Sequence, residues 1–255
     1  MELSVVIITY NEEQRLAPTL RAISTLADEI VIVDGGSTDR TKEIACSFPN
    51  VVWLERPFDT YGRQKNFGND HARGKYIFSL DADEVLTPML ASEIATEKGH
   101  WRADVYALPR VPVYVDKEIR CSDWYPDIKW RIYRRGIATW SNDLVHEHLL
   151  FQKDVRRHVF SGELLHYSYE SIVEHLQRNI HYSALAARQL FAIHQRPSMG
   201  RAFIRAGLRF LKSLVFKRGY RAGWRGWAIA ALGASVYIQR ELLLAERWER
   251  HDSQH

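Results

Sequence analysis

The sequence predicts an α/β fold, in which a mainly parallel sheet is flanked by helices and a helical appendage follows at the C-terminal end. Three observations support this prediction. Apolar, β-branched runs alternate with helix-like segments through residues 3–84, polar or acidic residues follow several of these runs, and residues 171–255 have helical periodicity. Strands that alternate with helices form right-handed βαβ units around a parallel sheet. We therefore expect a first domain at residues 1–170 and a helical region at residues 171–255.

Each expected element follows from a local pattern. Residues 3–9 form an apolar run typical of a buried strand, and Leu20, Ile23 and Leu26 have the spacing of a helix after Pro18. After the second strand, Ser37 or Thr38 is expected to cap the next helix. The expected strands are residues 3–9, 29–33, 51–54 and 76–80, and the helices between them include residues 39–48 and 62–71.

Acidic residues follow the fourth expected strand directly. Asp81 and Asp83 alternate along an extended chain, so their carboxylates can point to the same side. Two such groups repel each other unless a cation or a shared proton compensates, and oxygen ligands suit Mg²⁺ or Mn²⁺. The alternative is a solvated acidic turn that opens a helix near Pro88. The carboxyl edge of the sheet is in either case where such folds bind ligands.

Composition narrows the class of protein. The chain has 255 residues, 46% of them hydrophobic, which is enough for a sizeable core. Its net charge of +4 and pI near 9.0 favour anionic partners. Cys46 and Cys121 are the only cysteines, so we expect no disulfide framework and a reducing compartment. The N-terminus shows no basic region followed by a cleavage site, so no signal peptide is expected.

The middle of the chain is aromatic and contains prolines. Pro109 and Pro112 interrupt strand-like residues 104–115, which favours edge positions. Aromatic faces such as those of Trp124 and Tyr125 can stack on sugar rings, although filling a core is their commoner role. Polar neighbours, including Asp127, make Trp124 the best candidate for an exception to core packing.

Several ordered motifs together resemble family 2 glycosyltransferases with the GT-A fold. They are residues 5–12 (VVIITYNE), 32–39 (IVDGGSTD), 64–66 (QKN) and 80–84 (LDADE). Residues 124–127 (WYPD), 131–136 (RIYRRG) and 145–147 (VHE) resemble the subgroup of β-glucosyltransferases that act on the lipopolysaccharide inner core. The resemblance covers residues 3–170, and the rest more loosely.

The resemblance implies a UDP-sugar donor bound across the sheet edge, with Mg²⁺ or Mn²⁺ as cofactor. Asp83 would be the principal metal ligand, with Asp81 beside the ribose and the metal. His166 either helps the metal or diphosphate or is a hydrogen-bonded core histidine. The donor-binding residues implied are Thr9, Asn11, Glu12, Asp34, Lys65, Asp81, Arg131 and Arg134. The acceptor-binding residues predicted are Trp124, Tyr125 and Asp127.

Sugar transfer needs a base that takes the proton from the acceptor hydroxyl. Position and resemblance indicate Glu147, with Asp143 and Asp127 in reserve, and an ordinary ion pair is the alternative for Glu147. His146, His148 and His166 also raise the possibility of zinc. Their spacing does not match H-E-x-x-H, so zinc is disfavoured.

The tail has the pattern of a membrane-facing appendage. Residues 201–225 hold eight basic residues and no acid. Helical spacing puts Arg201, Arg205, Arg209 and Lys212 on one face and Ile204, Leu208, Leu211 and Val215 on another. This pattern suits an anionic membrane surface or, alternatively, a packed helix with a solvated charged face. Residues 227–238 are apolar but shorter than the ~20 residues of a spanning helix. We expect no transmembrane segment, and an oligomer contact there is possible.

We therefore predict an inverting, metal-dependent glycosyltransferase that moves glucose from UDP-glucose to a lipopolysaccharide core heptose. It would act in the cytoplasm, peripherally on the inner face of the cytoplasmic membrane. Within the enzyme class, a polyprenyl phosphate or a peptide could be the acceptor instead. A non-catalytic nucleotide- or RNA-binding protein is the other alternative. Acids at the sheet edge would repel a polyanion, so no nucleic-acid partner is expected.

Overall fold

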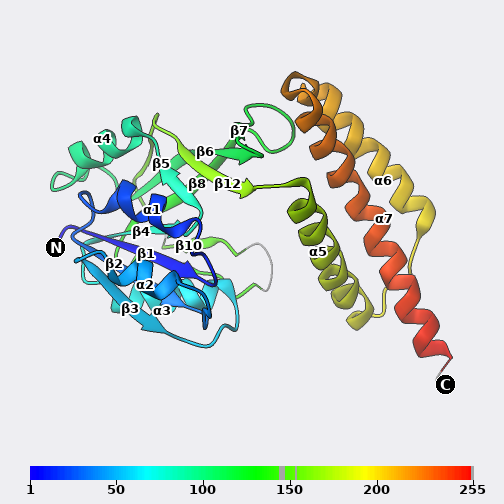
Figure 1. Cartoon of the computed structure of the whole chain (residues 1–255), viewed down its shortest axis with the longest axis horizontal. Helices are drawn as coiled ribbons and strands as arrows, with labels where there is room; N and C mark the ends of the chain where they lie inside the picture. Colours follow the sequence, from blue (N-terminus) through cyan, green and yellow to red (C-terminus); the bar gives the residue numbers. More distant parts are fainter. Residues whose placement is uncertain (144–146, 153, 254–255) are drawn as a thin grey trace. The chain divides into compact units, whose positions relative to one another are not determined.

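The computed structural model describes residues 1–143, 147–152 and 154–253, and the chain divides into two compact units (Figure 1). The first unit comprises Met1–Val111 and Asp127–His166, and the second comprises Pro112–Pro126 and Tyr167–His255. The change of unit after His166 lies close to the expected border at residue 170. Residues 112–126, which the sequence placed in the first domain, group instead with the C-terminal helices.

The first unit has the predicted alternation of strands and helices. Its first half contains β1 (Leu3–Thr9), α1 (Leu16–Ile23), β2 (Glu29–Asp34), α2 (Thr41–Cys46), β3 (Val51–Glu55), α3 (Tyr61–His71), β4 (Tyr76–Asp81), β5 (Glu84–Leu86) and α4 (Pro88–Glu97). Next come β6 (Val105–Tyr114), β7 (Lys117–Glu118, in the second unit), β8 (Asp127–Arg134), β9 (Ala138–Trp140), β10 (Leu149–Phe151), β11 (Arg157–Val159) and β12 (Leu164–Tyr169). The four strands expected in residues 3–84 are all present, within one residue of the expected ends.

The strands form one large sheet in the order β3-β2-β1-β4-β8-β6-β12-β5, while β9 and β10 make a separate pair. The first four strands are parallel, and β8 then runs antiparallel to both β4 and β6. The fold is thus the predicted α/β class, with a parallel half that carries the early motifs.

Alternate residues of the parallel strands enter two different cores. Val5 and Ile7 pack with α1 and α4, while Val6 packs on the opposite face with Val31 and Val33. Gly68 of α3 lies against this second face, where a Cβ would come within 2.4 Å of a Val6 methyl. Because both faces are covered, the strands are continuous apolar runs, which is why they could be found in the sequence.

Two local predictions were wrong. β6 continues through Pro109 and Pro112, and it lies between β8 and β12 instead of at an edge. A proline keeps its carbonyl as an acceptor, and that of Pro112 accepts from Ile119 N–H. Helix α2 begins after Arg40, and neither Ser37 nor Thr38 caps it, because Asp39 accepts from Thr41 N–H.

The second unit is helical, with α5 (Ile172–Ala192), α6 (Met199–Leu211) and α7 (Trp224–Asp252), and α7 packs on both α5 and α6 (Figure 1). A π-helical turn (Lys212–Phe216) and a 3₁₀ turn (Gly219–Ala222) separate α6 from α7, so the basic segment 201–225 is not one helix. In the described part of the chain, α7 alone is long and apolar enough to cross a membrane, by length and composition only, and 28% of its most apolar stretch is buried.

An aromatic cluster ties residues 112–126 to α5. His175 of α5 stacks on Tyr169 with ring centroids 4.3 Å apart, and its Nδ1 lies 3.0 Å from the Tyr114 hydroxyl. Trp124 packs on the same histidine, with centroids 5.6 Å apart. Burial lowers the pKa of His175 to about 4. A neutral imidazole is therefore part of this core.

We predict that the second unit loses stability in mild acid because of His175. The unfolded chain binds the imidazole proton with a pKa near 6.5, whereas the folded chain does so only near 4. The stabilisation is therefore complete above pH ~6.5 and is lost as the pH falls towards ~4, by roughly 2 kcal/mol. His175→Phe should flatten this dependence in urea unfolding followed by circular dichroism. His181→Phe, at an exposed site on the same helix, should leave the slope unchanged; equal slopes for wild type and His175→Phe would contradict the assignment.

Candidate active site

The predicted convergence of polar residues at one sheet edge is present. Thr9, the last residue of β1, pairs with Asp34 at the end of β2, and Ile8 pairs with Asp81 at the end of β4. The parallel register therefore puts Thr9, Asp34 and Asp81 along the carboxyl edge. Thr9 is buried, and its hydroxyl has no hydrogen-bond partner within the described ranges.

The loops after β1 and β2 are joined and stabilised by hydrogen bonds, and the residues that make them include Asn11 and Asp34, both indicated by the sequence. Asn11, in a left-handed conformation, accepts from Thr38 N–H through Oδ1 at 2.8 Å, and its own N–H donates to the Ser37 hydroxyl. The Asp34 carboxylate accepts from the N–H groups of Gly36 and Ser37. Asp34 and Asn11 thus hold the shape of the edge, whatever they also bind.

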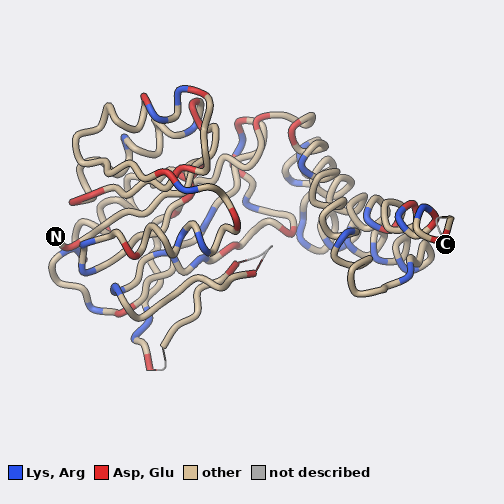
Figure 2. The backbone as a smooth tube through the Cα atoms, turned by 90° about the horizontal axis from the view of Figure 1, so that it is seen from below, with Lys and Arg blue, Asp and Glu red and all other residues tan. Residues whose placement is uncertain are grey.

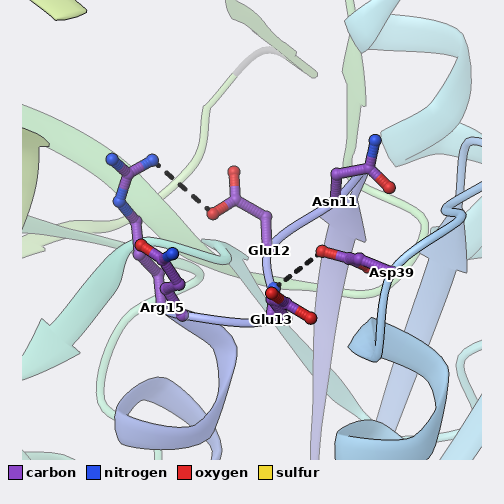
Figure 3. Close-up of a pocket in the computed structure, with 6 residues that line it drawn as sticks. Asn11, Glu12, Glu13, Arg15 and Asp39 are labelled. Carbon is purple, nitrogen blue, oxygen red and sulfur yellow. Dashed lines mark hydrogen bonds and ion pairs between the residues drawn. The ribbon is translucent and has the colours of Figure 1, made fainter.

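A small polar cavity opens beside these loops (Figure 3). It has a volume of about 250 Å³ and is lined by Asn11, Glu12, Glu13, Gln14, Arg15 and Asp39. Glu12 faces Arg15 across 3.7 Å, and Glu13 N–H donates to Asp39. Such a lining offers hydrogen-bond donors and acceptors to a polar ligand, and little apolar surface.

The strongest feature of the edge is a chain of alternating charges. Arg131 on β8 donates through Nη2 to Asp81 at 2.6 Å and to the fully buried Glu84 at 2.8 Å. Arg110 on β6 lies 3.2 Å from Glu84 and 2.7 Å from Asp127. From one end to the other the chain is Glu147–Lys65–Asp81–Arg131–Glu84–Arg110–Asp127. Each buried charge is therefore compensated by a neighbour of opposite sign.

Lys65 of α3 contacts both Asp81, at the end of the fourth strand, and Glu147, the predicted base. Its buried ammonium lies 3.1 Å from Asp81 Oδ1 and 2.9 Å from Glu147 Oε1. It also lies 4.4 Å from the ring centre of Trp140, a cation–π distance. The structure thus brings together Lys65, Asp81, Arg131 and Glu147, which are far apart in sequence. Val145 and His146, which precede Glu147, lie outside the described residues.

The cations set the protonation state of the aspartates. Burial would raise the pKa of Asp81, but the charges of Arg131, Lys65 and Arg110 outweigh it and hold that pKa well below the ordinary value. Burial likewise acts to raise the pKa of Asp83, and the charge and hydrogen bond of His166 lower it. Both carboxylates are therefore ionised at neutral pH and available to bind cations.

Asp83 and His166 are the pair best suited to a divalent ion. Asp83 Oδ2 lies 3.3 Å from His166 Nε2, because β12 pairs with β5 so that His166 is opposite Glu84. No group of three or more potential ligands gathers among the described residues, since both oxygens of Asp81 contact Lys65 or Arg131. The Asp83 carboxylate suits either Mn²⁺ or Mg²⁺, which take part of their coordination from substrate phosphates and water, while the imidazole nitrogen favours Mn²⁺, because Mg²⁺ takes oxygen ligands.

Several other predicted residues lie elsewhere. Arg134 pairs with Tyr76 at the amino end of β4, and its Nε lies 3.6 Å from Asp104 Oδ1, away from the carboxyl edge where the other predicted donor-binding residues gather. Antiparallel pairing sends Arg131 towards Asp81 and Arg134 away from it. Asp143 is half exposed and lies 3.3 Å from His148 Nδ1. Asp127 pairs with Arg110 in the first unit, whereas Trp124 and Tyr125 belong to the second.

Sequence reasoning missed three members of the site: Arg110, Glu84 as an ion-pair partner, and Trp140 beneath Lys65. A signal for Arg110 existed. It is a lone charge inside the apolar run Val105–Tyr114, and a charged residue within a buried strand needs a partner. The identity of that partner depends on pairing between β6, β8 and β4, which the sequence does not display.

Comparison with known proteins bears on this site. Residues 4–160, more than half of the chain, match the family model described as Glycosyl transferase family 2. A Rickettsia typhi protein named as an uncharacterized glycosyltransferase is 27% identical over 257 residues, which cover 96% of this chain and 87% of that protein. The lipopolysaccharide core biosynthesis glycosyltransferase LpsC of Rhizobium meliloti is 28% identical over 98% of this chain and 93% of its own length. Among solved structures, S. aureus TarS 1-349 in complex with UDP has a TM-score of 0.47 and 15% identity, with 100% of this chain and 92% of that chain covered.

We predict that Arg131→Met destabilises the first unit by about 3–5 kcal/mol at neutral pH, because it leaves Asp81 and Glu84 facing each other without the shared guanidinium. Urea unfolding measures the loss. Arg134→Met is the matched control on the same strand. Its partially exposed pair with Asp104 should contribute no more than about 1 kcal/mol. Similar losses for both variants would mean that the buried chain of charges is not what stabilises this edge.

Proposed function

This chain belongs to glycosyl transferase family 2 and is a glycosyltransferase, and we propose that it transfers glucose from UDP-glucose to a heptose of a lipopolysaccharide core. The observation that carries the proposal is the arrangement around Asp83. The neighbouring carboxylates are compensated by arginine and lysine, whereas Asp83 faces His166 at the sheet edge. The acceptor class is supported by LpsC, whose name places it in lipopolysaccharide core biosynthesis.

The donor's nucleoside would lie over the edge formed by β1 and β2. Thr9 has a buried hydroxyl without a partner among the described residues, and Asn11 and Glu12 line the adjacent cavity. The Asp34 carboxylate, already fixed by Gly36 and Ser37, has lone pairs left for a ribose hydroxyl or a base N–H. The diphosphate would extend from there towards Lys65 and Arg131, which supply positive charge.

Asp83 and His166 would hold Mn²⁺ or Mg²⁺, with Asp81 alongside. When bound there, the divalent ion supplies positive charge to the diphosphate that leaves during transfer. The chain's own contribution is to keep Asp83 ionised and to fix His166 opposite β5. Asp81 is oriented by Arg131 and Lys65 and contributes negative charge at the sheet edge.

Glu147 is the proposed base. Its carboxylate is held by Lys65 at 2.9 Å, and the same ammonium contacts Asp81, so Glu147 and Asp81 lie on either side of one cation. An ionised carboxylate there can accept the proton of the acceptor hydroxyl while that oxygen attacks the sugar carbon and the bond to the diphosphate breaks. One in-line displacement of this kind inverts the anomeric centre. Asp143, which accepts from the Ser141 hydroxyl, is the reserve.

An acceptor carried on lipid puts the reaction at the cytoplasmic membrane, and we propose a peripheral location on its inner face. Transfer to a polyprenyl phosphate or a peptide is the alternative within the enzyme class, and Trp124, Tyr125 and Asp127 stay predictions for acceptor binding. A non-catalytic nucleotide- or RNA-binding role is set aside, because the chain is a glycosyltransferase. A screen of UDP-sugars against core oligosaccharide, scored by UDP release and product mass, tests donor and acceptor together.

Asp83→Asn should abolish metal-dependent binding of UDP. For the wild type, UDP at a hundredfold excess over its Kd, with Mn²⁺, should stabilise the fold by about 2.7 kcal/mol in thermal unfolding, and omission of Mn²⁺ should remove most of that gain. The variant should show no difference with and without Mn²⁺. Asp70→Asn, at an exposed site on α3, is the control and should behave like the wild type. Metal-dependent stabilisation that persists in Asp83→Asn would rule out the proposed ligand.

Glu147→Gln should lower kcat by roughly 10²–10⁴-fold and leave the Kd for UDP unchanged, because the amide keeps the shape but cannot take a proton. Calorimetry gives the Kd and UDP release gives the rate. Asp143→Asn should retain most of the rate. If Asp143→Asn is the slow variant and Glu147→Gln turns over normally, the base is Asp143.

A further inference from the structure

Helix α6 is packed the opposite way from an ordinary surface helix. Its buried positions are small, with Ala202 at 1% and Ala206 at 6% exposure, and α6 packs on α7. Its large apolar side chains are outside, with Ile204 at 65% and Leu208 at 64% exposure. A helix of a soluble domain normally turns its large apolar residues inward. The exposed apolar residues of α6 therefore indicate a contact with something outside the second unit.

The exposed apolar residues form one continuous stripe. Ile204, Leu208 and Leu211 follow the i, i+4, i+7 spacing of one face of α6, and the exposed Val215 follows them in the π-helical turn. Phe210 meets Trp227 of α7 with ring centroids 6.0 Å apart, which continues the surface onto the next helix. We call this stripe, together with the cations that border it, the apolar-basic face. Its exposed apolar members are Phe203, Ile204, Leu208, Leu211, Val215 and Trp227.

Cations line one side of the stripe. At ~100° per residue, Arg201, Arg205 and Lys212 lie 60–100° around the helix from Ile204, and all three are exposed. Residues 201–225 contain no acid, and Lys and Arg recur along the helices near the C mark in Figure 2. Arg209 is different, because its guanidinium pairs with Asp123 at 2.8 Å within the unit. The three border cations are thus available to an outside partner.

We propose that the apolar-basic face lies in the surface of an anionic phospholipid bilayer, with the apolar stripe inserted among the acyl chains and the border cations at the headgroups. This deepens the proposed function, on which it rests only for the choice of the cytoplasmic membrane. Charge complementarity selects the occupant. A symmetric second copy would bring the same cations face to face, whereas phosphate headgroups oppose them with negative charge. An exposed tryptophan next to aliphatic residues also suits the boundary between headgroups and acyl chains.

A liposome experiment on the full-length protein separates insertion from simple charge attraction. The wild type should sediment with vesicles of equal parts phosphatidylglycerol and phosphatidylcholine, and not with phosphatidylcholine alone. Ile204→Ser with Leu208→Ser and Leu211→Ser should weaken binding at least about tenfold. Arg201→Gln with Arg205→Gln should weaken it roughly 30-fold. In both variants, UDP binding with Mn²⁺ should be unchanged, so failure of this proposal is distinct from failure of the proposed function.

The matched control replaces exposed apolar residues in the same unit, Val173 and Ile180 of α5 and Ile193 directly after that helix, each by Ser, and it should bind vesicles like the wild type. Equal loss in the control would overturn the proposal, because binding would then follow apolar exposure anywhere. Retention of the wild type on vesicles after alkaline carbonate would overturn it in favour of a spanning helix. A concentration-dependent dimer in sedimentation velocity that the Ser variant abolishes, without vesicle binding by the wild type, would assign the face to a second copy.

Discussion

The structure of the sheet edge depends on the compensation of buried charge. Glu84 is fully buried and Arg131 nearly so, and each has two partners of opposite charge: Glu84 contacts Arg131 and Arg110, and Arg131 contacts Glu84 and Asp81. An unpaired ion in the interior would cost several kcal/mol. The acids come from the end of β4 and the start of β5, while the cations come from α3, β6 and β8. When these five elements pack against each other, their acidic and basic side chains therefore neutralise one another. The edge can thus hold several carboxylates close together, and the pKa values of Asp81 and Asp83 lie below the ordinary value.

Because of this compensation, Asp81 and Asp83 have different roles at the edge. Asp81 is held by Lys65 and Arg131, so its charge is largely met by the chain itself. Asp83 faces His166 at 3.3 Å, and an imidazole nitrogen is a possible ligand for Mn²⁺. A site that fixes one carboxylate and leaves the next for an incoming ion is organised before the ligand arrives, which lowers the reorganisation that binding requires.

Most of the first unit could be predicted because its information is local. Strands covered on both faces are apolar runs, and the residues after Thr9, Asp34 and Asp81 mark their carboxyl ends. What could not be predicted depends on pairing across long sequence separations. Arg131 and Arg134 are three residues apart and look equivalent in the sequence. The antiparallel register of β8 on β4 pairs Arg134 with Tyr76 at the amino end of β4, whereas the guanidinium of Arg131 reaches Asp81 at the carboxyl end. The same dependence concealed Arg110, and it allowed β6 to run through two prolines in mid-sheet, where composition favoured an edge.

The second unit shows the limit of periodicity as a predictor. The stripe from Ile204 to Val215 was visible in the sequence, but an apolar stripe is equally compatible with burial, and only the neighbouring helix decides. In α6 the size of the side chains determines which face is buried. Ala202 and Ala206 allow α7 to approach closely on one side, so the bulky residues lie on the other side. Small residues on the packed side of a helix and large apolar residues on its open side cannot both be explained by the stability of the unit. Exposed apolar area gives no stabilisation in water, and its presence beside the exposed Arg201, Arg205 and Lys212 is the observation on which the proposed bilayer contact rests.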